Sequence, residues 1–224
     1  QAKFFDVVTW TGNAVSGREI PHNLGSVPGM IIVKQRTGLN NWMVYHRGAN
    51  GGTNAENYNL YLNLTNANEA NAMWADTAPT DTHFTVTGGA AVNGANNTYV
   101  AYIFAHDTDA SSLIQCGSYT GNGSNTGPVV NLGWEPQWLL FKNVSAAVRE
   151  TVPCDWMISD NVRGIEPTQY VLEPNTSDAE GAQGVGLNVT PTGFQIDDAN
   201  RILNYSGDTF IYMAIRNSSI PTIT

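Results

Sequence analysis

Apolar and polar residues in this chain follow the two-residue period of β-strands. Residues 58–64 alternate Tyr and Leu with polar positions, which is the pattern of a strand with one buried face. Residues 28–34 form a nearly continuous apolar run behind a turn, which is typical of a strand buried in a core. No segment sustains three turns of amphipathic helical period, so we predict a nearly all-β fold.

The same patterns predict the other strands. They are expected at residues 4–10, 42–46, 83–87 and 99–106 in the first half, and at 113–119, 138–143, 155–159, 170–173, 193–196 and 209–216 in the second. Residues 42–46 are predicted to be the antiparallel partner of the strand at 28–34. Long loops are predicted at residues 47–57, 66–75, 121–127, 146–153 and 177–186, where Gly, Asn and other turn-forming residues gather.

Residues 22–34 return in degenerate form as residues 130–142. The positions kept in both copies are Asn23, Leu24, Gly25, Pro28 and Lys34, which recur as Asn131, Leu132, Gly133, Pro136 and Lys142. Each copy predicts a turn, whose Gly supplies a permissive backbone and whose Pro fixes φ. A buried strand that ends in a solvated Lys is expected to follow the turn.

Other landmarks recur in the same order at a spacing of about 110 residues, far longer than a solenoid or propeller unit. They are Trp10, Trp42, Arg47 and Phe84 in the first copy, and Tyr119, Trp156, Arg163 and Phe194 in the second. We therefore predict two tandem, homologous β-sandwich units of the jelly-roll kind, residues 1–108 and 109–224. Residues kept in both copies, Trp42 and Trp156 among them, are expected to pack in the cores.

Composition and charge exclude several partners. The net charge is −9 with only 10 Lys and Arg, so the chain lacks the basic surface of nucleic-acid-binding proteins. No apolar run approaches the roughly 20 residues that a membrane helix requires, and we expect no membrane insertion. The chain starts at Gln1 without an initiator Met, which favours a chain processed or cut from a longer polypeptide.

Longer strings of residues resemble a known family. Residues 22–34 read His-Asn-Leu-Gly-Ser-Val-Pro-Gly-Met-Ile-Ile-Val-Lys, and residues 98–107 read Thr-Tyr-Val-Ala-Tyr-Ile-Phe-Ala-His-Asp. With Ser-Tyr-Thr-Gly-Asn-Gly-Ser at 118–124, these strings resemble a domain common in bacteriophage tail-fibre and other virion surface proteins. The resemblance implies a β-rich module of the virion, assembled in the bacterial host and exposed outside it. It also implies that the module is often trimeric, with loops that contact host glycans.

Candidates for catalysis and metal binding lack the spacing that such chemistry requires. The four His residues show no His-x-x-x-His spacing, and the Asp-rich segments at 107–109 and 197–198 lack the Gly and distant Glu of a calcium loop. Cys116 and Cys154 are expected to be buried free thiols, because a domain of this size rarely needs a disulfide, and a disulfide between them is the alternative. No Cys-x-x-Cys pattern exists, so there is no zinc or redox signature. We predict no catalytic residues, no metal site and no cofactor.

The candidate contact surface is aromatic and amide-rich, since aromatic faces stack on sugar rings and dominate protein interfaces. Trp74 and Trp134 have no matching Trp in the other copy, and Trp134 stands in a turn where exposure is expected. Asn122 and Asn125 lie in the Gly-rich loop 121–127, which is expected to be the most flexible stretch of the chain. We predict that these four residues contact a partner.

The leading hypothesis is a non-enzymatic virion structural or adhesion module. Its expected partners are other virion proteins, further copies of itself in a homo-oligomer such as a trimer, and a host cell-surface glycan or receptor. A capsid decoration protein is an alternative that the same composition allows. A glycan depolymerase is a second alternative, which requires two facing carboxylates, and the sequence offers only unpaired candidates, Glu166, Asp178 and Asp197.

Overall fold

A six-stranded antiparallel sheet forms most of the first half of the chain. A computed structural model describes residues 3–109, 111–149, 152–164, 170–182, 186–199 and 201–217. The strands of the sheet, in spatial order, are β1 (Phe5–Thr11), β8 (Thr98–Ala105), β3 (Pro28–Gln35), β4 (Met43–His46), β5 (Tyr58–Tyr61) and β6 (Glu69–Ala70). β4 is the antiparallel partner of β3, as the sequence predicts.

A second, two-stranded layer covers one face of this sheet. It consists of β2 (Arg18–Pro21) and β7 (His83–Val86). Between the layers lies an apolar core that Ile20 and Phe84 enter from the small sheet, and Trp10, Ile31 and Tyr99 enter from the large one. Alternate residues of β8 point into this core, because successive side chains of a strand point to opposite faces of the sheet.

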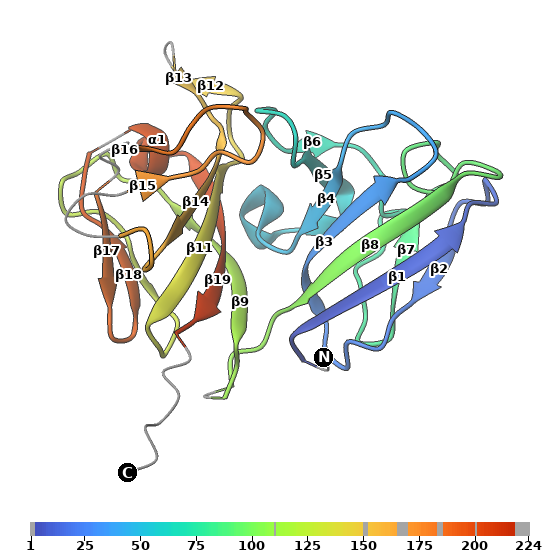
Figure 1. The fold of residues 1–224 in the computed structure, drawn as a ribbon, viewed down its shortest axis with the longest axis horizontal. Helices are drawn as coiled ribbons and strands as arrows, with labels where there is room; N and C mark the ends of the chain where they lie inside the picture. Colours follow the sequence, from blue (N-terminus) through green and yellow to red (C-terminus); the bar gives the residue numbers. More distant parts are fainter. Residues whose placement is uncertain are drawn as a thin grey trace.

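The second half repeats this plan. Its large sheet has the order β14 (Trp156–Asp160), β11 (Pro136–Asn143), β19 (Thr209–Arg216) and β9 (Ile114–Thr120). A three-stranded sheet packs on it, with the order β10 (Val129–Asn131), β18 (Gly193–Ile196) and β17 (Leu187–Thr190). Among the described residues, every strand pairs with strands of its own half, and the two halves lie side by side (Figure 1).

Equivalent strands occupy equivalent places in the two halves. β9, β19, β11 and β14 follow the same spatial order as β1, β8, β3 and β4, and β3 and β11 each carry a register shift just after their Pro. Trp10 stacks on Tyr99 with ring centroids 5.3 Å apart, and its counterpart Tyr119 stacks on Phe210 at 5.2 Å. The predicted fold class, all-β with packed antiparallel sheets, is confirmed. The division at residues 108 and 109 into two domains stays a prediction.

The two large sheets pack against each other through the faces that point away from their own cores. We call this contact the junction. Met30, Ile32 and Val44 of the first half meet Cys116 and Met213 of the second in one buried apolar cluster. β3 is therefore buried on both faces, which explains its unbroken apolar sequence.

Glycines allow a close approach at the junction. A Cβ atom at Gly29 would lie 2.7 Å from the Sγ of Cys116, and one at Gly48 would lie 2.7 Å from the carbonyl oxygen of Gly117. Both distances are shorter than real Cβ contacts, so β9 could not lie where it does against a larger residue at either position. The two glycines thus set the spacing between the halves.

Side-chain hydrogen bonds also cross the junction. Nε2 of His46 lies 3.0 Å from the carbonyl oxygen of Tyr212, and the indole N–H of Trp156 donates to the carbonyl of Tyr61 over 2.8 Å. The ammonium group of Lys142 donates to the carbonyl oxygen of Thr65 at 2.8 Å. Each bond joins a buried polar group of one half to the other half, so the junction is specified by polar as well as apolar contacts.

Two repeated residues differ from the prediction. Lys142 is buried, not solvated, because the 61–68 segment of the first half covers it, and its ammonium also donates to the carbonyls of Asn143 and Cys154. Burial lowers the pKa of Lys142 to about 8. Trp42 is only half-buried, because it directly precedes β4 at the margin of the junction, where it packs against the junction cluster and stacks on Tyr102 with ring centroids 6.4 Å apart.

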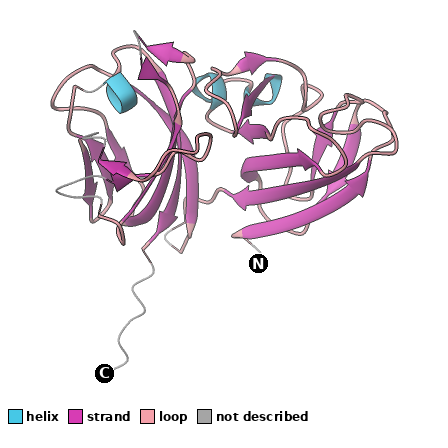
Figure 2. Ribbon diagram, turned by 45° about the horizontal axis from the view of Figure 1, so that its top comes forward, coloured by secondary structure: helices cyan, strands magenta, loops and turns pink. Residues whose placement is uncertain are grey.

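Helices are few and short in the described residues (Figure 2). They are η1 (Ala49–Gly52), η2 (Ala55–Asn57) and α1 (Arg201–Asn204), and none has the length and apolar character needed to cross a membrane. Two small hairpins complete the fold, β12 (Val148–Arg149) with β13 (Val152–Pro153) and β15 (Tyr170–Val171) with β16 (Gly181–Ala182). Cys116 and Cys154 are buried and form no disulfide, which confirms the prediction made for them.

Candidate functional site

The two Trp residues of the predicted contact surface are buried in separate cores. Trp134 is 4% exposed, and its indole N–H donates to the hydroxyl of Ser112 at 3.1 Å. Trp74 is 1% exposed, and its indole N–H donates to the carbonyl of Tyr58. The prediction that Trp134 is exposed is wrong, because the turn before β11 folds its apolar side into the second-half core.

Asn122 and Asn125 are exposed, as a contact surface requires, and they share the loop 121–127. Buried Asn204 anchors this loop: its Oδ1 accepts from the N–H of Asn122 at 2.8 Å, and its Nδ2 donates to the carbonyl of Ser124 at 2.9 Å. Oδ1 of Asn125 accepts from the N–H of Ala199 at 3.1 Å. The loop is therefore held in a defined shape, and the structure brings these two residues together but not with either Trp.

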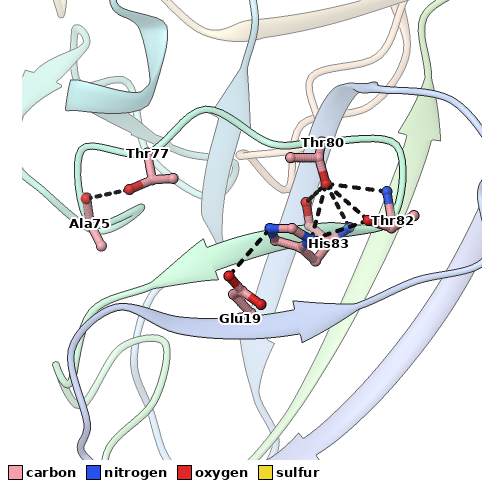
Figure 3. A network of polar contacts seen from close by, with 6 residues as sticks. All are labelled: Glu19, Ala75, Thr77, Thr80, Thr82 and His83. Atoms are coloured by element: carbon pink, nitrogen blue, oxygen red, sulfur yellow. Dashed lines mark hydrogen bonds and ion pairs between the residues drawn. The ribbon is translucent and has the colours of Figure 1, made fainter.

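A polar network between β2 and β7 has the composition of a hydroxyl, imidazole and carboxylate triad (Figure 3). The Thr80 hydroxyl lies 3.1 Å from Nδ1 of His83, and Nε2 of His83 lies 3.6 Å from Glu19. However, the Thr80 hydroxyl oxygen also accepts from the N–H groups of Thr82 and His83. Because these bonds occupy its lone pairs, the hydroxyl closes a turn and is not poised as a nucleophile.

The junction leaves part of each large sheet open. On the first half, Phe5, Val7, Tyr102 and Phe104 of β1 and β8 share the face that carries the junction, and all four remain partly exposed. We call them the open strip. Their rings touch: Phe5 stacks on Tyr102 with centroids 6.4 Å apart and meets Phe104 at 5.0 Å.

On the second half, the open part lies at the opposite side of the equivalent sheet. Trp138 and Ile158 are partly exposed, and Leu172, which pairs with Ile158, is 40% exposed. We call these three residues the open corner. A shallow depression of about 490 Å³ adjoins Trp138, and its other lining residues are Gln137, Asp160, Asn161, Val162 and Arg163.

An ion pair borders this depression. Nε of Arg163 donates to the Asp160 carboxylate at 2.7 Å, and its Nη2 lies 2.5 Å from the same oxygen. Burial alone would raise the pKa of Asp160, but hydrogen bonds from the Arg163 side chain and backbone, and from the Val162 N–H, hold that pKa below its ordinary value. The pair neutralises the charge at the edge of the apolar corner, which makes the corner easier to desolvate.

The open strip and open corner were missed as contact residues, although strand alternation carries a signal for them. Leu139 and Phe141 point into the second-half core, so Trp138 and Leu140 must point outward. The same argument places Tyr102 and Phe104 opposite Ala101 and Ile103. Apolar residues on both faces of a strand indicate that both faces are covered, and the sequence cannot say by what.

The acidic candidates for catalysis do not form a site in the described residues. Asp178 and Asp197 are exposed, and Glu166 lies outside the described residues. No three His, Cys, Asp or Glu side chains of the described ranges gather closely enough to hold a metal ion.

A family described as a domain of unknown function, DUF7483, matches residues 1–218. The chain belongs to this family. No curated protein and no solved structure matches it. The DUF7483 match spans both halves and covers the segments that carry the junction, the open strip and the open corner.

Proposed function

We propose that this DUF7483 chain is a non-enzymatic structural and adhesion module of a phage virion, which works as a homo-oligomer and presents its loops to a host glycan or receptor. The observation that carries the proposal is the open strip and open corner. Large apolar side chains stay partly exposed there, on sheet faces that continue the buried junction. Contiguous apolar surface of this kind marks protein interfaces. The virion setting rests on the resemblance of the sequence strings described above.

Self-association is tested on the full chain by native mass spectrometry and by light scattering after gel filtration. We expect a single oligomeric species at micromolar concentration, with a trimer as the leading candidate. The species should persist at high salt, because the open surfaces are apolar and not charged. A strict monomer at every concentration would remove the basis of the assembly proposal.

Host contact is proposed for the loop 121–127, whose exposed amides are held in place by Asn204. A pre-shaped polar loop binds sugar hydroxyls with little loss of conformational entropy. We expect Ser124→Ala and Asn125→Ala to weaken binding of the oligomer to host cells severalfold, while the melting temperature falls only slightly because each substitution removes one exposed hydrogen bond of the loop. Thr53→Ala, in an exposed loop of the first half, is the matched control. Equal adsorption by all three variants would contradict a role for the loop.

A further inference from the structure

We propose that copies of this chain associate head to tail, with the open strip of one copy packed on the open corner of the next, so that the contact between copies repeats the junction within each copy. The inference rests on the proposed self-association and names its surfaces. It follows from comparing equivalent positions in the two halves.

The junction covers opposite sides of the two equivalent sheets. Val7 on β1 is 46% exposed, whereas its counterpart Cys116 on β9 is 1% exposed. Conversely, Leu60 beside β4 is fully buried, whereas Leu172, which pairs with β14 in the same way, is 40% exposed. Within one chain, therefore, the β3–β4–β5 side of the first sheet packs on residues of β9 and β19 in the second, and Leu140 of β11 and Trp156 of β14 complete the buried cluster.

Each open surface is thus the counterpart of a surface that the junction buries. The open strip corresponds to Ile114, Cys116, Met213 and Ile215, which line the junction on the second half. The open corner corresponds to Met30, Val44 and Leu60, which line it on the first half. Within one chain, the second-half equivalent of the strip packs on the first-half equivalent of the corner. The strip of one copy can therefore pack on the corner of the next copy in the same way.

Both surfaces have the chemistry of an interface core. The strip is built from touching aromatic rings, and the corner presents Trp138 with two aliphatic side chains. Asp160 stands where the junction has His46, and its pairing with Arg163 avoids an uncompensated carboxylate beside the contact. Because the contact joins two different surfaces, it is heterologous and can close into a ring of copies.

Charge substitutions on each surface test this arrangement. Val7→Lys blocks the strip and Leu172→Lys blocks the corner, and both sites are exposed enough to tolerate Lys in the folded chain. Val15→Lys and Leu39→Lys are matched controls, because these residues are at least as exposed and lie elsewhere. Circular dichroism melting of all four variants checks that each is folded.

We expect Val7→Lys and Leu172→Lys each to be monomeric, and the two controls to assemble like the unmodified chain. A mixture of the two monomeric variants should form a heterodimer that grows no further, since one intact strip and one intact corner remain between them. Native mass spectrometry, with one variant isotopically labelled, identifies this species.

Three results would overturn the inference, and they are distinguishable from one another. If only one of Val7→Lys and Leu172→Lys loses assembly, the copies associate through like surfaces and the head-to-tail arrangement is wrong. If both variants are monomeric and their mixture forms no heterodimer, the open strip does not bind the open corner. If the unmodified chain is itself monomeric, the proposed self-association fails and the head-to-tail arrangement fails with it.

Discussion

The two repeated Trp residues show how one kept residue type can have two structural roles. Trp156 is 1% exposed and bonded to Tyr61 across the junction, whereas Trp42 is half-buried at the margin of the junction cluster. We predict that Trp156→Ala lowers the free energy of unfolding by about 3–5 kcal/mol through a cavity and a lost hydrogen bond. Trp42→Ala should lower the free energy of unfolding by about half as much, because the Trp42 side chain buries less apolar surface in the folded chain. Urea denaturation of both variants measures the difference, and equal costs would contradict it.

The repeated glycines before β3 and β11 are kept for a backbone reason. Gly25 has a φ of +70° and Gly133 a φ of +79°, and a Cβ atom at either position would meet nothing within 4 Å. Substitution by Ala therefore adds only the strain of a left-handed backbone, about 1 kcal/mol at each site. We predict that Gly25→Ala and Gly133→Ala destabilise the chain equally.

Asn at the same positions separates backbone strain from other causes. Because Asn tolerates a positive φ better than Ala, Gly25→Asn and Gly133→Asn should be less destabilising than the Ala variants in the same denaturation experiment. If the Asn and Ala variants lose the same stability, the glycines are kept for another reason. The repeated Gly predicts these turns correctly because a turn depends on the local φ and ψ angles. No information about distant segments of the chain is needed to predict it.

Strands were predictable where apolar and polar residues alternate or where apolar, β-forming residues follow one another in an unbroken run. β1, β3, β8, β11, β18 and β19 lie within a few residues of their predicted ranges. β2, β10 and β17 were not predicted, because short strands such as Arg-Glu-Ile-Pro present too few alternating positions to stand out from a loop. These three strands form most of the smaller sheets, so the sequence indicated the large sheets better than the layers that cover them.

Burial of individual side chains was harder to predict wherever two halves meet. The sequence pattern of β11 is correct for a buried strand, yet Lys142 was expected in solvent and lies under the 61–68 segment. Trp134 lies in the turn before Pro136 and is buried, whereas Trp138 lies in the strand that follows and is partly exposed. The position of each residue in a turn or a strand suggests the reverse. Local patterns describe which way a side chain points along its strand. They do not describe which distant segment covers it.

At the scale of the whole molecule, two His residues make the junction sensitive to acid. Nδ1 of His46 accepts from the N–H of Gly48 at 3.0 Å, which leaves Nε2 to donate to the carbonyl of Tyr212. Nδ1 of His106 likewise accepts from the N–H of Cys116 at 3.1 Å. Protonation of Nδ1 in either His would turn this acceptor into a donor that faces a backbone N–H group, and the hydrogen bond would be lost. Burial lowers the pKa of His46 to about 3 and that of His106 to about 4.

These shifts fix the direction of the pH dependence. Both His residues are neutral in the folded chain, whereas in the unfolded chain they take up protons as the pH falls through about 6.5. The stability they contribute is therefore complete above that pH and is lost progressively as the pH falls toward the folded-state values. For fully buried His46 alone, we predict a loss of about 2 kcal/mol in the free energy of unfolding between pH 7 and pH 5.

Substitution separates this effect from general acid denaturation. His46→Gln keeps a donor near Tyr212 but has no proton to gain, so it should be less stable than the unmodified chain at pH 7 and lose less stability on going to pH 5. His83→Gln, at a partly exposed His outside the junction, should keep the full pH dependence. Urea denaturation at the two pH values measures both. A full pH dependence in His46→Gln would show that protonation of His46 does not cause the loss of stability in acid.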